Sequence, residues 1–102
     1  MVIDLEGFCQ LAEARAAAWT ARGAVARLER SPDDGRSKAA AWLSIEVASI
    51  GGQLCVWDSG EGELEVYPAE AADQAVPRHY EDLKDPDLPE LLAAFDKLLG
   101  EA

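Results

Sequence analysis

Residues 41–66 read AWLSIEVASIGGQLCVWDSGEGELEV, and this central segment decides the fold. Apolar and polar residues alternate along 41–50, as they do in a β-strand that buries one face and exposes the other. The buried side would carry Leu43, Ile45 and Val47, and the other side Trp42, Ser44 and Glu46. The alternation resumes at residues 53–57 and 63–67, so the segment predicts three strands.

Two glycine-rich turns separate these strands. We expect Gly51-Gly52 to form a two-residue hairpin loop, because both positions of a type I′ turn need positive φ angles. This loop pairs Val47 with Val56 and Glu46 with Trp57. A second hairpin is predicted through residues 58–62. On the inner face it pairs Val56 with Leu64 and Leu54 with Val66. On the outer face it pairs Trp57 with Glu63, Cys55 with Glu65 and Gln53 with Tyr67. Together the turns predict a three-stranded antiparallel meander.

Helical patterns flank the meander. A long helix is predicted from Asp4, its cap, to about Arg30, with Gly23 marking a bend or a close packing contact inside it. Residues 31–35, SPDDG, then break the chain. The segment from Ala75 to Tyr80 is a candidate fourth strand at an edge of the sheet, because a proline at position 77 is tolerated only there.

The closing helix is predicted to begin at Asp87 and to end at Gly100. Asp87 would be its N-terminal cap, and Glu90 follows three residues later, as in a capping box. The order of elements predicts an α+β fold. It comprises an N-terminal helix, a three- to four-stranded antiparallel meander sheet and a C-terminal helix, with both helices on one face. No linker or repeat divides the sequence, so residues 1–102 are predicted to form a single domain.

Charge is distributed unevenly along the chain, whose net charge is −11. Thirteen of the twenty acidic residues lie from Asp58 onward, against three basic residues, whereas the first 57 residues are nearly neutral. Such a domain is expected to repel nucleic acid and anionic membranes and to attract a basic partner. The sequence shows neither an apolar run long enough to span a membrane nor a signal peptide. We therefore expect a cytoplasmic protein, with Cys9 and Cys55 as buried thiols in a reducing compartment.

The outer face of the predicted sheet is the candidate binding surface. It would show two tryptophans and a tyrosine among carboxylates, and aromatic residues are enriched at the energetic centres of protein interfaces. With the acidic turn, the predicted partner-binding residues are Trp42, Glu46, Trp57, Asp58, Glu61, Glu63, Glu65 and Tyr67. Two alternatives stay open: the aromatic residues are cross-strand packing pairs, or a flap from residues 68–82 covers them.

The sequence gives little support for catalysis or for a metal or cofactor site. His79 is the only histidine and the two cysteines are far apart, so the ligands of a zinc site are missing. No serine or cysteine lies in a nucleophile motif. Residues 58–63 depart from the EF-hand calcium pattern, and the glycine pair lacks the lysine of a phosphate-binding loop. We expect a protein that is not an enzyme and binds no metal and no cofactor.

Residues 52–66, GQLCVWDSGEGELEV, resemble the central signature of the TriTu family of bacterial immunity proteins. That signature is a strand, a Val-Trp-acidic-Ser-Gly turn and a strand of the form Leu-Glu-Val. The resemblance extends more loosely to residues 79–83 and to the closing helix. The positions that match are Trp57, Asp58, Ser59, Gly60, Glu63 and Glu65.

The resemblance implies an immunity protein that binds and neutralises a cognate antibacterial toxin. The toxin would be of the polymorphic, Rhs-associated type linked to type VI secretion. It would carry ADP-ribosyltransferase activity against the translation machinery. The hypothesis is that this chain, as a monomer or in a 1:1 heterodimer with the toxin, occludes the toxin's basic active-site cleft. The alternative is an acidic chaperone or adaptor that escorts an effector of a secretion system and alters its delivery or stability.

Overall fold

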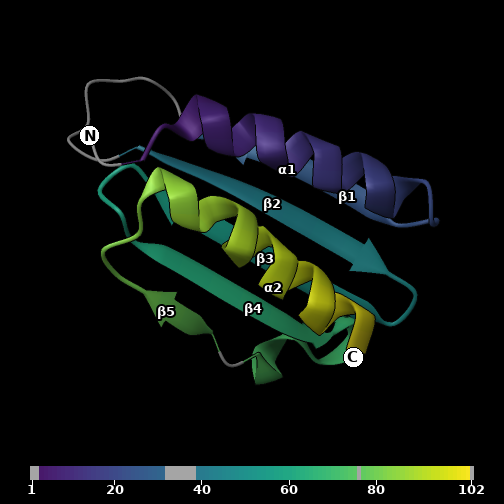
Figure 1. Cartoon of the computed structure of the whole chain (residues 1–102). Coiled ribbons are helices and arrows are strands. Elements are labelled where there is room, and N and C mark those ends of the chain that lie inside the picture. The colour runs from purple at the N-terminus through teal and green to yellow at the C-terminus, as the bar shows by residue number, and fades with distance from the viewer. Residues whose placement is uncertain (1–2, 32–38, 76, 102) are drawn as a thin grey trace.

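The computed structural model describes residues 3–31, 39–75 and 77–101, and its centre is one five-stranded antiparallel sheet (Figure 1). The strands are β1 (Val25–Arg30), β2 (Ala40–Val47), β3 (Ile50–Trp57), β4 (Gly62–Pro68) and β5 (Arg78–Tyr80). Each strand pairs with the next one along the chain, so the sheet is a meander. The predicted α+β class is confirmed, with five strands instead of three or four.

The first helix, α1 (Leu5–Thr20), is shorter than predicted. Its start is as expected, because the Asp4 carboxylate accepts a hydrogen bond of 3.2 Å from the N–H of Glu6. The chain then leaves the helix at Gly23, whose φ of 91° lies in the left-handed region that favours glycine. Gly23 is therefore part of the turn that follows the helix, and not a bend inside it.

The prediction of a helix as far as Arg30 was wrong, because residues 25–30 form the edge strand β1. Their burial alternates: Ala26 and Leu28 pack against the core, whereas Val25 and Arg27 are exposed. A period of two residues suits a strand, and it places the apolar side chains against α1 only in that conformation. Ser31 closes the strand, since its hydroxyl accepts a 2.9 Å hydrogen bond from the N–H of Ala40. The rest of the predicted break at residues 31–35 lies outside the described residues.

Both predicted hairpin registers were wrong. The first turn lies at residues 48–49, with Val47 opposite Ile50, and Glu46 pairs with Gly51 and not with Trp57. In the second hairpin Leu54 pairs with Leu64 and Cys55 with Glu63. Each displacement is an even number of positions, and side chains alternate between faces with a period of two. Every residue of strands β2, β3 and β4 therefore keeps the face that the sequence predicted for it.

The two helices cover one face of the sheet, as predicted, and α1 and α2 (Leu88–Glu101) run side by side over it (Figure 1). Phe8 of α1 and Phe95 of α2 are fully buried between the helices and the strands. The other large side chains that are fully buried include Ile3, Leu43, Ile45, Leu54, Val56, Leu64, Leu88 and Leu92. The core therefore lies between this helical layer and the inner face of the sheet.

The start and end of α2 differ from the prediction. Asp87 closes the short 3-10 turn η2 (Asp85–Asp87) before the helix, because its carboxylate accepts a 2.9 Å hydrogen bond from the N–H of Lys84. The helix continues through Gly100 to Glu101, so this glycine does not end it. The Asp85 carboxylate accepts a 2.8 Å hydrogen bond from the N–H of Asp4. Part of the acidity before α2 is thus structural.

The predicted fourth strand is present as β5 but is shorter than residues 75–80. It begins at Arg78, directly after Pro77, and pairs with β4 at the edge of the sheet. The 3-10 segment η1 (Ala69–Gln74) links the two strands. Residues 78–80 therefore extend the sheet sideways, so they are not part of a flap over the outer face, which was one of the two alternatives.

Candidate protein-binding face

The face of the sheet turned away from the helices carries the candidate site. Residues paired across antiparallel strands lie on the same face, so the register arranges them in rows. The rows are Val25, Glu46, Gly51 and Tyr67; then Arg27, Ser44, Gln53 and Glu65; then Glu29, Trp42, Cys55, Glu63 and His79. These residues, with Trp57 at the end of β3, are called the outer face below.

The structure brings six of the eight predicted partner-binding residues together on the outer face. They are Trp42, Glu46, Trp57, Glu63, Glu65 and Tyr67. The three aromatic residues are half-buried, whereas Glu46 and Glu63 are exposed. The aromatic side chains therefore have part of their surface packed among neighbours and part available to a partner. That any of these residues contacts a partner stays a prediction.

The other two predicted residues, Asp58 and Glu61, lie in the turn between β3 and β4. The main chain of Asp58 is tied to the scaffold, since its N–H donates to the Ala39 carbonyl and its carbonyl accepts from Ile3, both at 3.0 Å. Glu61 accepts a 2.9 Å hydrogen bond from the Trp57 N–H through its carbonyl. Its carboxylate accepts a 3.2 Å bond from the hydroxyl of Ser59. The Trp-Asp-Ser-Gly turn thus builds the hairpin.

Three residues of the outer face were missed by sequence reasoning because β1 was assigned to a helix. Val25, Arg27 and Glu29 all lie on this face, and Val25 is 61% exposed. The alternation in VARLER could have revealed them, since Ala26 and Leu28 are the residues turned to the core. Arg27 adds one cation to a face that otherwise carries carboxylates.

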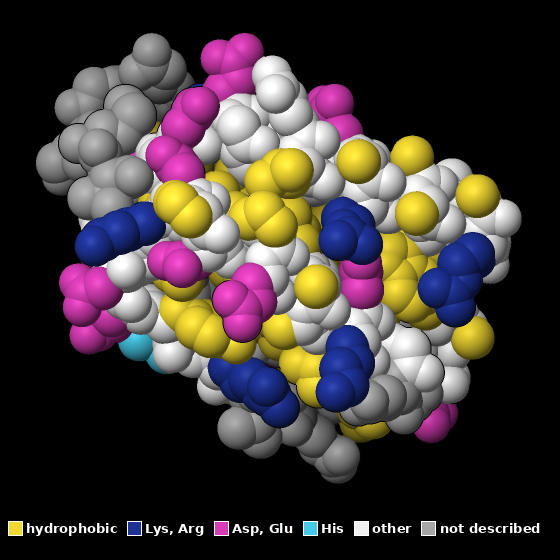
Figure 2. Space-filling model, in the orientation of Figure 1, with side chains coloured by type: hydrophobic (Ala, Val, Ile, Leu, Met, Phe, Trp, Pro, Cys, Tyr) yellow, Lys and Arg dark blue, Asp and Glu magenta, His cyan; other side chains and the backbone are white. Residues whose placement is uncertain are grey.

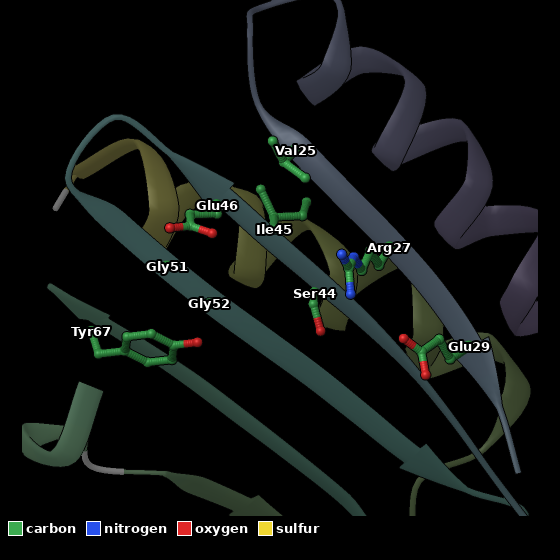
Figure 3. A pocket seen from close by; sticks show the side chains of 9 residues that line it. All are labelled: Val25, Arg27, Glu29, Ser44, Ile45, Glu46, Gly51, Gly52 and Tyr67. Carbon is green, nitrogen blue, oxygen red and sulfur yellow. The ribbon is translucent and has the colours of Figure 1, made fainter. Parts of the chain in front are cut away.

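A hollow of about 510 Å³ opens on the outer face at its first two rows and reaches Glu29 of the third (Figure 3). It exists because Gly51 has no side chain and Ser44 has a small one. The ring of Tyr67 leans over the glycine, and a Cβ at position 51 would lie 2.7 Å from its Cε2 atom. The residues that line the hollow are Val25, Arg27, Glu29, Ser44, Ile45, Glu46, Gly51, Gly52 and Tyr67.

Charged groups in the hollow are not paired with one another. Within the described part of the chain, the side chains of Arg27, Glu29 and Glu46 form no hydrogen bond or ion pair. At the opposite end of the third row, His79 lies 3.8 Å from Glu63 and 3.5 Å from Glu81. The hollow therefore offers charged groups that are free to interact with an external group.

The thiol of Cys55 lies on the outer face beside these carboxylates. Burial, together with the nearby Glu63 carboxylate, raises the pKa of Cys55 from 9.0 to about 11. Burial also raises the pKa of Cys9. Both cysteines are free and half-buried, not buried as predicted. A protonated thiol is a poor nucleophile, so neither side chain is suited to covalent catalysis near neutral pH.

The helical side of the molecule is organised differently. Asp96 of α2 accepts 2.8 Å hydrogen bonds from the Arg15 guanidinium and from the indole N–H of Trp19, both in α1. Arg22 lies 4.3 Å from the centre of the Trp19 ring. Figure 2 shows basic and acidic side chains interspersed among apolar ones on this side. Charge here ties the two helices together.

The described residues include no group of three or more His, Cys, Asp or Glu side chains placed to hold a metal ion. In the same part of the chain, no helix has both the length and the apolar character needed to cross a membrane. What the geometry does provide is a broad surface with four carboxylates and three half-buried aromatic residues.

These features define a small α+β protein, with one face of the sheet packed under the helices and the other face turned away from them. The model of a family described as "Immunity protein TriTu" matches residues 6–99, so this chain belongs to the TriTu family of immunity proteins. The resemblance first seen in residues 52–66 is thereby confirmed over nearly the whole chain. Family membership supports an immunity role through binding to a cognate toxin. No curated protein and no solved structure matches the chain.

Proposed function

We propose that this immunity protein neutralises its toxin by docking the outer face over the toxin's active-site cleft. The observation that carries the proposal is the gathering of aromatic residues and exposed carboxylates on the one sheet face that the helices leave free. Carboxylates attract a cleft lined by arginine and lysine and speed the encounter. Half-buried aromatic side chains add rigid apolar contact area. Occlusion of this kind requires no catalysis by the inhibitor.

The toxin is proposed to be an ADP-ribosyltransferase of the polymorphic, Rhs-associated type, delivered by type VI secretion and directed at the translation machinery. Its cleft has to hold the negatively charged pyrophosphate of a dinucleotide, so basic groups are expected there. A chain with a net charge of −11 complements such a cleft. The dinucleotide chemistry belongs to the toxin. A target in translation places the encounter in the cytoplasm, where we propose a 1:1 complex.

Co-expression with the cognate toxin domain tests the function itself. We expect the chain to restore growth of cells that produce the toxin and to co-purify with it as a stable complex. An interface that holds such a complex should bury at least about 1,000 Å². Absence of both rescue and binding at micromolar concentrations would refute an immunity role. If the chain alters delivery of the toxin but does not restore growth, a secretion chaperone would be the better interpretation.

A pair of charge reversals tests which face docks. Glu63→Lys, combined with Trp57→Ala on the outer face, is expected to weaken toxin binding by about a hundredfold or more, because it removes an aromatic contact and opposes a basic cleft. The control Glu13→Lys makes the same charge reversal on an exposed position of α1. It should change the dissociation constant by about threefold at most. Equal losses of binding and of thermal stability in the outer-face variant would favour a packing role for Trp57.

A further inference from the structure

The hollow at Gly51 combines an aromatic ring with an exposed carboxylate, and we propose that it receives one arginine side chain of the toxin. This inference rests on the proposed function and deepens it by naming the central contact. The hollow is large enough for a single long side chain, at about 510 Å³, and it opens toward the side on which a partner would dock. A recess that accepts an anchor residue is typical of the centre of a protein interface.

The shape of the hollow depends on the missing Cβ atom of Gly51 as well as on the small side chain of Ser44. Tyr67 pairs with Gly51 across β3 and β4, and its ring leans over the glycine because nothing occupies that space. A Cβ at position 51 would lie 2.7 Å from Cε2 and 3.1 Å from Cζ of the tyrosine. The glycine thus gives the ring its position. An aromatic ring beside a recess is a favourable surface for a cation, and for a planar guanidinium above all.

Charge selects a cation over an anion. Glu46 pairs with Gly51 from the other side, so a carboxylate and the Tyr67 ring flank the glycine, as Figure 3 shows. Glu29 also lines the hollow, and Arg27 is the one basic side chain among its lining residues. The side chain of Glu46 is exposed and has no hydrogen bond or ion pair within the described residues. An incoming guanidinium would form a charge-assisted pair with it while contacting the tyrosine.

The test uses the full chain and the isolated toxin domain, with affinity measured by calorimetry. Glu46→Gln removes the charge and keeps the shape, and Tyr67→Leu removes the ring. Each is expected to weaken binding by about tenfold or more. The matched control Glu13→Gln, on the helical side, should change affinity by about twofold at most. Circular dichroism would verify that each variant keeps its fold.

Double-mutant cycles identify the occupant. Each surface arginine of the toxin is changed to glutamine, and we expect one of these variants to lose its sensitivity to Glu46→Gln. The proposal is overturned if both hollow variants bind the toxin as tightly as the wild type. Energetic coupling of Glu46 to a lysine of the toxin, and not to an arginine, would overturn it as well. So would a loss of affinity in Arg27→Gln while Glu46→Gln leaves the affinity unchanged. These results would leave the proposed function standing, whereas failure of the wild-type chain to bind the toxin would refute both.

Discussion

Two adjacent glycines in β3 act on opposite faces of the sheet, because neighbouring residues of a strand point in opposite directions. Gly51 leaves room for Tyr67 on the outer face. Gly52 leaves room for α2 on the inner face, where a Cβ would lie 2.8 Å from Cε1 of Phe95 and 2.9 Å from Cδ2 of Leu99. The pair reads as a hairpin turn in the sequence, but the structure uses it to bring two layers close to one strand.

Gly52→Ala is therefore expected to destabilise the protein by about 1–3 kcal/mol, the usual cost of overpacking a core. The new methyl group would also lie 3.2 Å from the backbone carbonyl of Glu65, which cannot rotate away. Gly51→Ala is the matched control, because its methyl group meets the Tyr67 ring on the outer face, where the ring has room to turn. Urea denaturation of both variants measures the difference. Equal loss of stability would contradict the assignment of the two faces.

The raised pKa of Cys55 leads to a prediction about pH. The thiol has a pKa of about 11 in the folded protein against an ordinary value of 9.0, so the folded state holds this proton more tightly. The protonated Cys55 thiol therefore makes its full contribution to the free energy of unfolding below about pH 9, and this contribution is lost as the pH rises toward 11. In a Cys9→Ser background, alkylation of Cys55 by iodoacetamide should stay slow at pH 8–9 and accelerate toward pH 11. A rate at pH 9 equal to that of the unfolded chain would contradict this.

At the scale of elements, the decisive difference from the prediction is that residues 25–30 form a strand. Alanine-rich α1 has strong helical propensity, and the apolar residues on both sides of Gly23 fit a helix loosely. Tertiary packing decides otherwise, because as β1 these residues gain a full ladder of hydrogen bonds with β2 and bury Ala26 and Leu28 under α1. The outer face gains Arg27 and Glu29 as a result.

Two glycines at the ends of helices are predicted to respond to substitution in opposite ways. A methyl group added at Gly23 or at Gly100 would meet no atom of the described residues within 4 Å beyond its own local backbone, so sterics are equal. Gly23→Ala should destabilise the protein by about 1 kcal/mol or more, because its φ of 91° is strained for alanine. Gly100→Ala lies within α2 and should stabilise by up to about 0.5–1 kcal/mol. Thermal unfolding of the two variants distinguishes these effects. A change of the unfolding temperature in the same direction for both would contradict the placement of Gly23 in a turn with positive φ.

For the whole molecule, the structure divides the acidic second half of the chain into two groups. Asp85 and Asp87 accept main-chain hydrogen bonds and hold the approach to α2 in place. Glu63 and Glu65, with Glu46 from β2, lie on the outer face. The second group is the part of this acidity that the proposed docking surface contains, while exposed carboxylates such as Glu81 and Glu90 lie outside both groups. The net charge of the chain therefore overstates the charge that is available for docking.

Binding to the toxin should depend on salt through this second group. The association rate constant is expected to fall by about tenfold or more between about 50 mM and about 500 mM sodium chloride, because exposed charges steer the encounter and salt screens them. Stopped-flow fluorescence can measure it. The Glu63→Lys variant should lose much of the salt dependence, and Glu13→Lys should keep it. An association rate that is independent of salt would contradict electrostatic steering by the outer face.

Residue patterns alone were enough to predict the fold class, the two-helix layer and the face on which each residue of strands β2, β3 and β4 lies. Alternation has a period of two, so faces survive an error in register as long as the displacement is even. The sequence also indicated the family through residues 52–66, and the family model matches residues 6–99. The pairing of the strands and the identity of β1 became clear from the three-dimensional structure, because both depend on contacts between distant segments. The hollow at Gly51 belongs to this second kind: it exists only where Glu46, Gly51 and Tyr67, from three different strands, come to lie in one row.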